Sequence, residues 1–177
     1  METAAKSQVR LESDASTDER PIFSGVMTGQ IAGLIMAVVV MIVFALFLGK
    51  SPLYPVQVIG SALLGESALQ GLNLAAILAG LVLHQLGPSL LWGFVFGSIA
   101  SKFEIRTTAR ALQFGLALGV VSMTGPYVLI PAVMNMLHGV DFWNREVPMF
   151  WDWAAHIVFG LSFALYPRVQ AKLSLRR

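Results

Sequence analysis

Three long stretches without a charged residue constrain this chain more than any other feature. Residues 22–49, 74–101 and 111–140 contain no Asp, Glu, Lys or Arg. Each stretch exceeds the roughly 20 residues that an α-helix needs to cross the hydrocarbon core of a bilayer. Charged residues make up only 12% of the chain, about half their usual share in a soluble domain, so the composition excludes a water-soluble globule.

The apolar stretches predict an all-α, polytopic membrane protein with four transmembrane helices. In lipid, only helices and closed barrels satisfy every backbone hydrogen-bonding group, and runs of this length lack the alternation of barrel strands. The fourth span is shorter and needs Asp152 in its first turn to reach about 20 residues. The predicted transmembrane domain covers residues 22–168, with spans at about 23–48, 74–101, 111–137 and 148–167.

The segments outside the spans are two polar tails and one apolar connection. Residues 1–21 have mixed charge and no apolar periodicity, which predicts a disordered tail, and the apolar run after them is too long for a cleavable signal peptide. Residues 169–177 form a basic tail. In the connection 51–73, Val56, Ile59 and Leu63 recur at helical spacing and predict a short helix in the membrane interface.

The basic residues predict the orientation in the membrane. Of the 12 Lys and Arg residues, all except Lys50 and Arg145 lie in the two tails or between the second and third spans. The positive-inside rule therefore places both termini in the cytoplasm. These flanks also account for the net charge of +2, so nucleic-acid binding is not expected and the lipid bilayer is the predicted environment.

Stripes of small residues at intervals of four mark one face on each of three predicted helices. Such stripes let helix backbones approach closely, and a ligand groove lined by glycine is the alternative interpretation. Because one bundle does not need a stripe on every helix, we expect a homo-oligomer or a complex with other membrane subunits. The stripe glycines are Gly25, Gly29 and Gly33 in the first span, Gly93 and Gly97 in the second, and Gly115 and Gly119 in the third.

Two histidines at membrane depth are the main candidates for a functional site. An ionisable side chain in a span is energetically costly and usually faces the bundle interior or a wet cavity. His84 and His156 each lie on a stripe of small residues. Asp152 precedes His156 by one helical turn and could accept its ring N–H. Ser122 and Tyr127 add polar groups in the third span, beside prolines that free backbone carbonyls.

Four interpretations of His84 and His156 stay open. They could form interhelical hydrogen bonds, ligate a haem as cofactor with one imidazole from each of two helices, line a path for protons or small solutes, or take part in catalysis. Apart from this possible haem, the sequence predicts no cofactor. The chain has no Cys, no paired carboxylates at membrane depth and no HExxH, GxSxG, P-loop or dinucleotide motif. We therefore predict no metal site. The leading prediction for the function is a non-enzymatic membrane component that acts with partners or in envelope homeostasis. A haem-bearing or redox subunit and a transporter are the alternatives.

Short motifs in all four spans carry a resemblance to a known group. They are Gln30-Ile31-Ala32-Gly33, the segment from Ser51-Pro52 to Leu64, His84 before the aromatic stretch 91–96, residues 131–137 and Ala155-His156-Ile157-Val158. Over residues 29–167 the chain resembles the YagU-like group of uncharacterised bacterial inner-membrane proteins, although it lacks the longer insertion expected between the first two spans. The resemblance implies four spans in a bacterial cytoplasmic membrane and no established activity.

Overall fold

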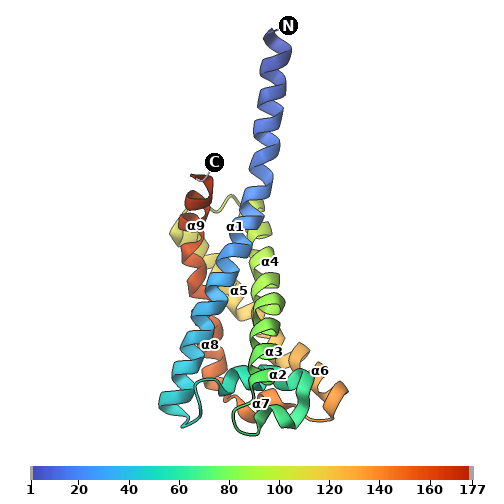
Figure 1. Cartoon of the computed structure of the whole chain (residues 1–177). Coiled ribbons are helices and arrows are strands. Elements are labelled where there is room, and N and C mark those ends of the chain that lie inside the picture. Colours follow the sequence, from blue (N-terminus) through green and yellow to red (C-terminus); the bar gives the residue numbers. More distant parts are fainter. Residues whose placement is uncertain (1, 176–177) are drawn as a thin grey trace.

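The computed structural model describes residues 2–175, with side chains from residue 21 onward, and no strand occurs in this part of the chain. The α-helices are α1 (Glu2–Phe47), α2 (Tyr54–Leu64), α3 (Leu74–His84), α4 (Leu90–Lys102), α5 (Thr108–Ser122), α6 (Ile130–His138), α7 (Phe142–Glu146), α8 (Met149–Ser162) and α9 (Tyr166–Ser174) (Figure 1). Two short 3₁₀ helices, η1 (Gly65–Leu69) and η4 (Phe163–Leu165), and two π-helices, η2 (Gln85–Ser89) and η3 (Gly125–Leu129), connect some of them.

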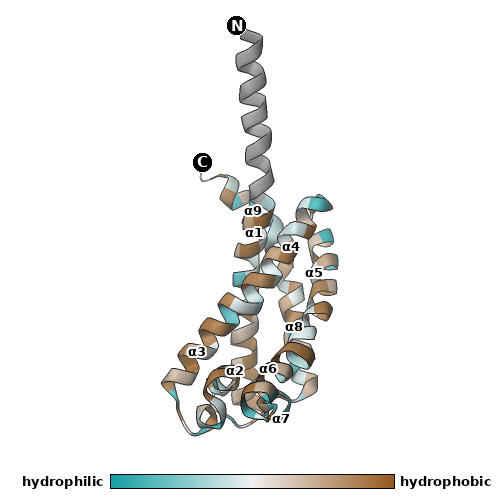
Figure 2. Ribbon diagram, turned by 90° about the vertical axis from the view of Figure 1, so that its right-hand side faces the viewer, coloured by the Kyte–Doolittle hydropathy of each residue, from teal (hydrophilic) through white to brown (hydrophobic). Residues whose placement is uncertain are grey.

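Three of the predicted spans are confirmed as helices that are long and apolar enough to cross a membrane. They are Pro21–Phe47 in α1, Leu74–Lys102 in α3–η2–α4, and Thr108–His138 in α5–η3–α6. Asn73 and Thr107 begin the second and third spans as N-caps, since their side chains accept the backbone N–H of Ala76 and Arg110. Apolar side chains cover the outside of the helices, while hydrophilic residues gather in the α4–α5 connection and around α7 (Figure 2).

The fourth predicted span, 148–167, is not among these three helices. It falls in α8, which has 14 residues and contains Asp152 and His156, followed by the 3₁₀ turn η4 and by α9. The polar side chains and the short apolar run distinguish this segment from the other three. The predicted disordered tail at residues 1–21 falls on the first turns of α1, where the backbone is helical from Glu2 onward. Residues 176–177 of the predicted basic tail lie outside the described part.

Both ends of the described chain lie at the same end of the bundle. The N-terminus, α9 and the α4–α5 connection are at the upper end in Figure 1, and α2 and α7 are at the lower end. Helix α2 lies across that lower end, and its buried residues pack against α3, α6 and α7. The predicted helix in the 51–73 connection is therefore present, and it closes the lower end of the bundle.

The glycine stripes pack against one another inside a single chain. A Cβ atom on Gly29 would lie 2.5 Å from the Cα of Gly93, so the backbones of α1 and α4 are in direct contact. Gly119 and Gly160 bring α5 and α8 together in the same way. Within the described residues no stripe is therefore left over for another chain, because the stripes on α1, α4 and α5 all have partners within the chain. Oligomerisation remains a prediction without this support.

A polar network holds the lower end together. Arg145 donates to both carboxylate oxygens of Glu66 at 2.8 and 3.0 Å and to Glu146 at 2.8 Å. The Tyr54 hydroxyl donates to the other oxygen of Glu146 at 2.7 Å. His138 at the end of α6 donates through Nε2 to the backbone carbonyl of Ala62 at 3.1 Å. The network connects α2, η1 and α7, segments that are distant in the sequence.

Acidification is expected to weaken this network through Glu146. Burial opposes ionisation of Glu146, but the hydrogen bonds from Tyr54 and Arg145 outweigh it and hold the pKa of Glu146 below its usual 4.5. A carboxylate with a lowered pKa in the folded state stabilises the protein above its unfolded pKa, and this contribution is lost as the pH falls through the folded value. We expect Glu146→Gln to flatten the fall in thermal stability below about pH 4.5. If the thermal stability of Glu146→Gln fell with acidification as steeply as that of the wild type, the role assigned to Glu146 would be contradicted.

Candidate functional site

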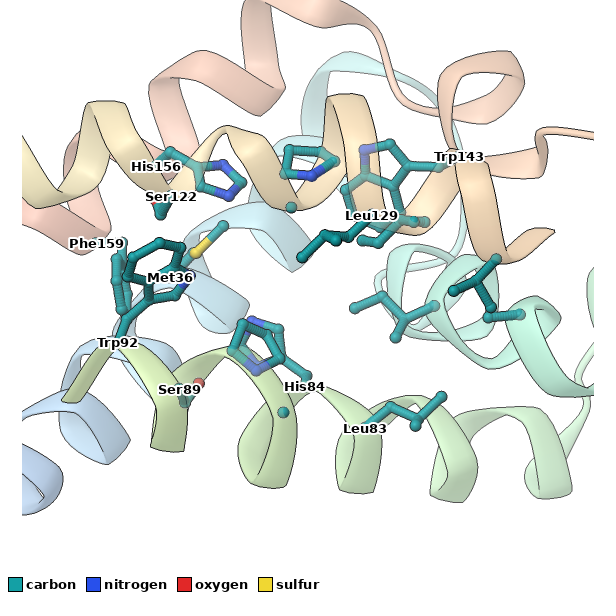
Figure 3. Close-up of a pocket in the computed structure, with 18 residues that line it drawn as sticks. Met36, Leu83, His84, Ser89, Trp92, Ser122, Leu129, Trp143, His156 and Phe159 are labelled. Carbon is teal, nitrogen blue, oxygen red and sulfur yellow. The ribbon is translucent and has the colours of Figure 1, made fainter. Parts of the chain in front are cut away.

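A cavity of about 300 Å³ lies within the helix bundle, at the lower end of the size range of ligand pockets. Its walls come from all four helical segments of the bundle and from α2 and α7. Figure 3 shows His84 and His156 on opposite walls, with their rings turned toward the space between them. The rest of the lining is almost entirely apolar, with Trp92, Trp143 and Phe159 as its aromatic members.

The two π-helices form one side of this cavity. Each contains a Gly-Pro pair, Gly87-Pro88 in η2 and Gly125-Pro126 in η3, and all four residues line the cavity. Proline lacks a backbone donor and collides with the preceding turn, which accounts for the widened helix at each site. Gly87, Pro88 and Leu129 are exposed as well as part of the lining, so the cavity reaches the surface of the protein at η2 and η3.

A chain of amides fixes the ring of His84. Gln85 Nε2 lies 3.1 Å from Oε1 of Gln30 and 3.4 Å from the backbone carbonyl of Gln30, so this end of the Gln85 amide is the donor. The Oε1 atom of Gln85 then faces Nδ1 of His84 at 3.0 Å and also accepts the Ser89 hydroxyl at 3.3 Å. The His84 ring therefore carries its hydrogen on Nδ1, and Nε2 has a free lone pair.

Asp152 fixes the ring of His156 from the same helix. Nδ1 of His156 lies 3.0 Å from the backbone carbonyl of Asp152 and 3.3 Å from its Oδ1. A carbonyl only accepts, so Nδ1 is the donor. The second side-chain oxygen, Oδ2, accepts the indole N–H of Trp143 at 3.2 Å. His156 is only 8% exposed and Asp152 only 3%, so both partners are held in the interior.

The other predicted site residues have different positions. Ser122 lines the cavity, but its hydroxyl donates to the backbone carbonyl of Gly119 at 2.7 Å. Asp152 lies behind His156 and does not line the main cavity. Tyr127 also lies outside the lining, and its buried hydroxyl has no hydrogen-bond partner among residues 21–175. The cavity thus joins His84, His156 and Ser122, but not Asp152 or Tyr127.

Several residues of the site do not follow from the sequence patterns. The amides of Gln30 and Gln85 set the orientation of His84, and Trp92 and Trp143 form aromatic walls. A signal for the amides was available, since glutamine is uncommon in charge-free apolar runs and must find partners there. No comparable signal existed for Trp143, which lies in α7 between the predicted third and fourth spans.

No protein-family model, curated protein or solved structure matches this chain. Within residues 21–175, no group of three or more His, Asp or Glu side chains is placed to hold a metal ion.

Proposed function

We propose that the chain crosses the membrane four times, with both termini in the cytoplasm of a bacterial cell. The run from Met149 to Ser174 through α8, η4 and α9 is about 39 Å long at 1.5 Å per residue, which exceeds the roughly 30 Å of a bilayer core. It begins at the same end as α7, and Arg168 and Lys172 follow in α9. The location in an inner membrane and the kinship with the YagU-like group are parts of the same proposal.

A reporter enzyme that is active only outside the cytoplasm tests this topology. We expect it to be inactive when it is fused after Arg177 and active when it is inserted at Asn144 in α7, because an even number of spans returns the chain to the cytoplasm. Activity at both sites would remove the fourth crossing, and the reverse pattern would invert the orientation.

The function that the site supports best is binding of a small lipophilic molecule taken from the bilayer, without catalysis. The cavity between η2 and η3 carries this proposal: its walls are apolar, its opening faces the position of lipid, and two imidazoles provide the polar contacts. Pockets for small molecules combine a mostly apolar lining with a few oriented polar groups in this way. Such binding is compatible with a membrane component that acts with partners or in envelope homeostasis.

Haem is the second candidate, because both imidazoles present a free Nε2 from opposite walls. The lining provides no Lys or Arg to pair with haem propionates, which favours an uncharged ligand. Purified protein with a Soret band that is lost in His84→Ala and His156→Ala would favour haem instead.

The transport alternative requires solute flux into liposomes that responds to Asp152→Asn.

Fluorescence quenching tests lipophile binding directly. A Trp151→Phe/Trp153→Phe variant keeps Trp92 and Trp143, the two tryptophans that line the cavity, as reporters. We expect bromonaphthalene, a lipophilic heavy-atom quencher, to quench this variant with a saturable curve.

Two matched substitutions in the reporter variant provide the controls. Ala62→Phe adds a ring to the cavity lining and should abolish the saturable part of the curve, whereas Ala75→Phe, at an exposed position on α3 outside the lining, should leave it unchanged. Linear quenching that is equal in all variants would overturn the proposal, because it would reflect partition of the probe into the micelle alone.

A further inference from the structure

We propose that the cavity selects a lipophilic aromatic alcohol, of the phenol or quinol type, whose hydroxyl group donates a hydrogen bond to Nε2 of His84. This inference rests on the proposed function and specifies the chemical class of its ligand. It depends on three observations: the orientation of the two imidazoles, the aromatic walls and the absence of a competing partner for Nε2 of His84.

The orientation of His84 makes it a hydrogen-bond acceptor toward the cavity. The donor on Nδ1 is used by Gln85 Oε1 at 3.0 Å, and the amide of Gln85 is itself held by Gln30 at 3.1 Å. The contacts that fix His84 come from neutral amides, so no opposite charge stabilises an imidazolium there. Among residues 21–175, no group hydrogen-bonds to Nε2 of His84. A ligand that presents only a carbonyl or an ether oxygen would therefore leave this lone pair unmatched, while a hydroxyl group satisfies it.

His156 on the opposite wall is compatible with the same ligand group. Its Nδ1 is used by the backbone carbonyl of Asp152, with the Asp152 side chain 3.3 Å away. Nε2 of His156 accepts a hydrogen bond when the ring is neutral and donates one when the ring is protonated beside Asp152. A hydroxyl group has only one hydrogen, so the hydroxyl that donates to His84 can accept from a protonated His156, whereas a neutral His156 is satisfied by the second hydroxyl of a quinol.

The walls between the two histidines favour an aromatic body. Figure 3 shows Trp92 and Phe159 on one side of the space between the imidazoles and Trp143 on the other. Aromatic rings pack favourably against one another in offset or edge-to-face arrangements. A flat ring with a hydroxyl group therefore matches both the shape and the donor pattern of the site.

A matched pair of probes tests this inference with the same tryptophan reporters. Bromonaphthol and its methyl ether share one aromatic body and one heavy-atom quencher, and they differ in the hydroxyl hydrogen. We expect the naphthol to bind the Trp151→Phe/Trp153→Phe protein roughly 2- to 12-fold more tightly than the ether, which is the range of one neutral hydrogen bond. His84→Leu should remove this preference and leave both probes at the affinity of the ether.

A second variant tests the role of the His84 ring if His84→Leu does not fold. Gln85→Met removes the acceptor that fixes Nδ1 and lets the His84 ring present its N–H to the cavity, so the preference for the naphthol should fall while the imidazole remains. An unchanged preference in Gln85→Met would overturn the argument from ring orientation.

The remaining outcomes separate this inference from the proposed function. Equal saturable binding of the naphthol and the ether would overturn the hydroxyl selection but leave lipophile binding intact. A preference that persists in a folded His84→Leu protein would overturn the assignment to His84. Quenching by either probe that does not exceed the Ala62→Phe background would overturn both proposals.

Discussion

Gly29→Leu is expected to destabilise the folded protein by about 3 kcal/mol, at the upper end of the range for overpacked cores. A Cβ at this position would lie 2.5 Å from both the Cα of Gly93 and the backbone carbonyl oxygen of Ser89. Both obstacles are backbone atoms, so no change of rotamer relieves the clash and α1 must separate from α4. Chemical or thermal unfolding in detergent, followed by circular dichroism, measures the loss.

Gly87→Leu is the matched control for this prediction. A Cβ on Gly87 would meet no atom within 4 Å, so the same substitution should change stability by less than about 0.5 kcal/mol. Equal destabilisation by both substitutions would show that the loss does not come from the α1–α4 contact. A Gly29→Leu protein of unchanged stability but lower mass in detergent would instead place the stripe between chains.

The spans could be predicted because charge is excluded from hydrocarbon over a fixed length. Residues 74–101 and 111–137 coincide with helices to within three residues at each end. The segment 148–167 differs because Asp152 and His156 interrupt its apolar character. Their spacing predicts that they can pair, but only the structure shows Trp143 as a second partner of Asp152. Polar groups that satisfy one another in the interior cannot be distinguished in sequence from polar groups that end a span.

The glycine stripes predict close helix contacts without identifying the partner helices. Spacing predicts that Gly29 and Gly93 belong to close helix contacts, but it does not predict that they meet each other. That pairing depends on how the second span returns beside the first and on the register in which the two helices lie. Without the register, partners in the same chain and in another chain look alike, so spacing alone predicts a surplus face that the structure does not have.

The sequence predicts the two histidines of the candidate site but not the orientation of their rings. The cost of an ionisable group in a span identifies His84 and His156 from the sequence alone. The direction of each ring depends on Gln85 and on the backbone of Asp152, and the former is held by Gln30, 55 residues away in the chain. Hydrogen-bond roles at the cavity are therefore a property of the tertiary structure.

Asp152→Ala is expected to destabilise the protein by about 2 to 4 kcal/mol. The side chain of Asp152 is 3% exposed and accepts the indole N–H of Trp143 at 3.2 Å, with Nδ1 of His156 3.3 Å from its other oxygen. Truncation leaves the indole N–H buried without a partner, whereas the His156 ring keeps the backbone carbonyl at 3.0 Å. Asp152→Asn retains one acceptor oxygen and should lose less stability than Asp152→Ala in thermal unfolding.

A double-mutant cycle with Trp143→Phe shows whether the indole is the reason for this loss. Phenylalanine has no N–H, so removing Asp152 should destabilise a Trp143→Phe background less than the wild type, by roughly 1 kcal/mol or more. Strict additivity of the two substitutions would mean that the 3.2 Å contact contributes nothing and that Asp152 acts through His156 alone. A positive coupling would instead show that one buried carboxyl group joins α7 to α8, and thereby holds Trp143 and His156 together at the wall of the cavity.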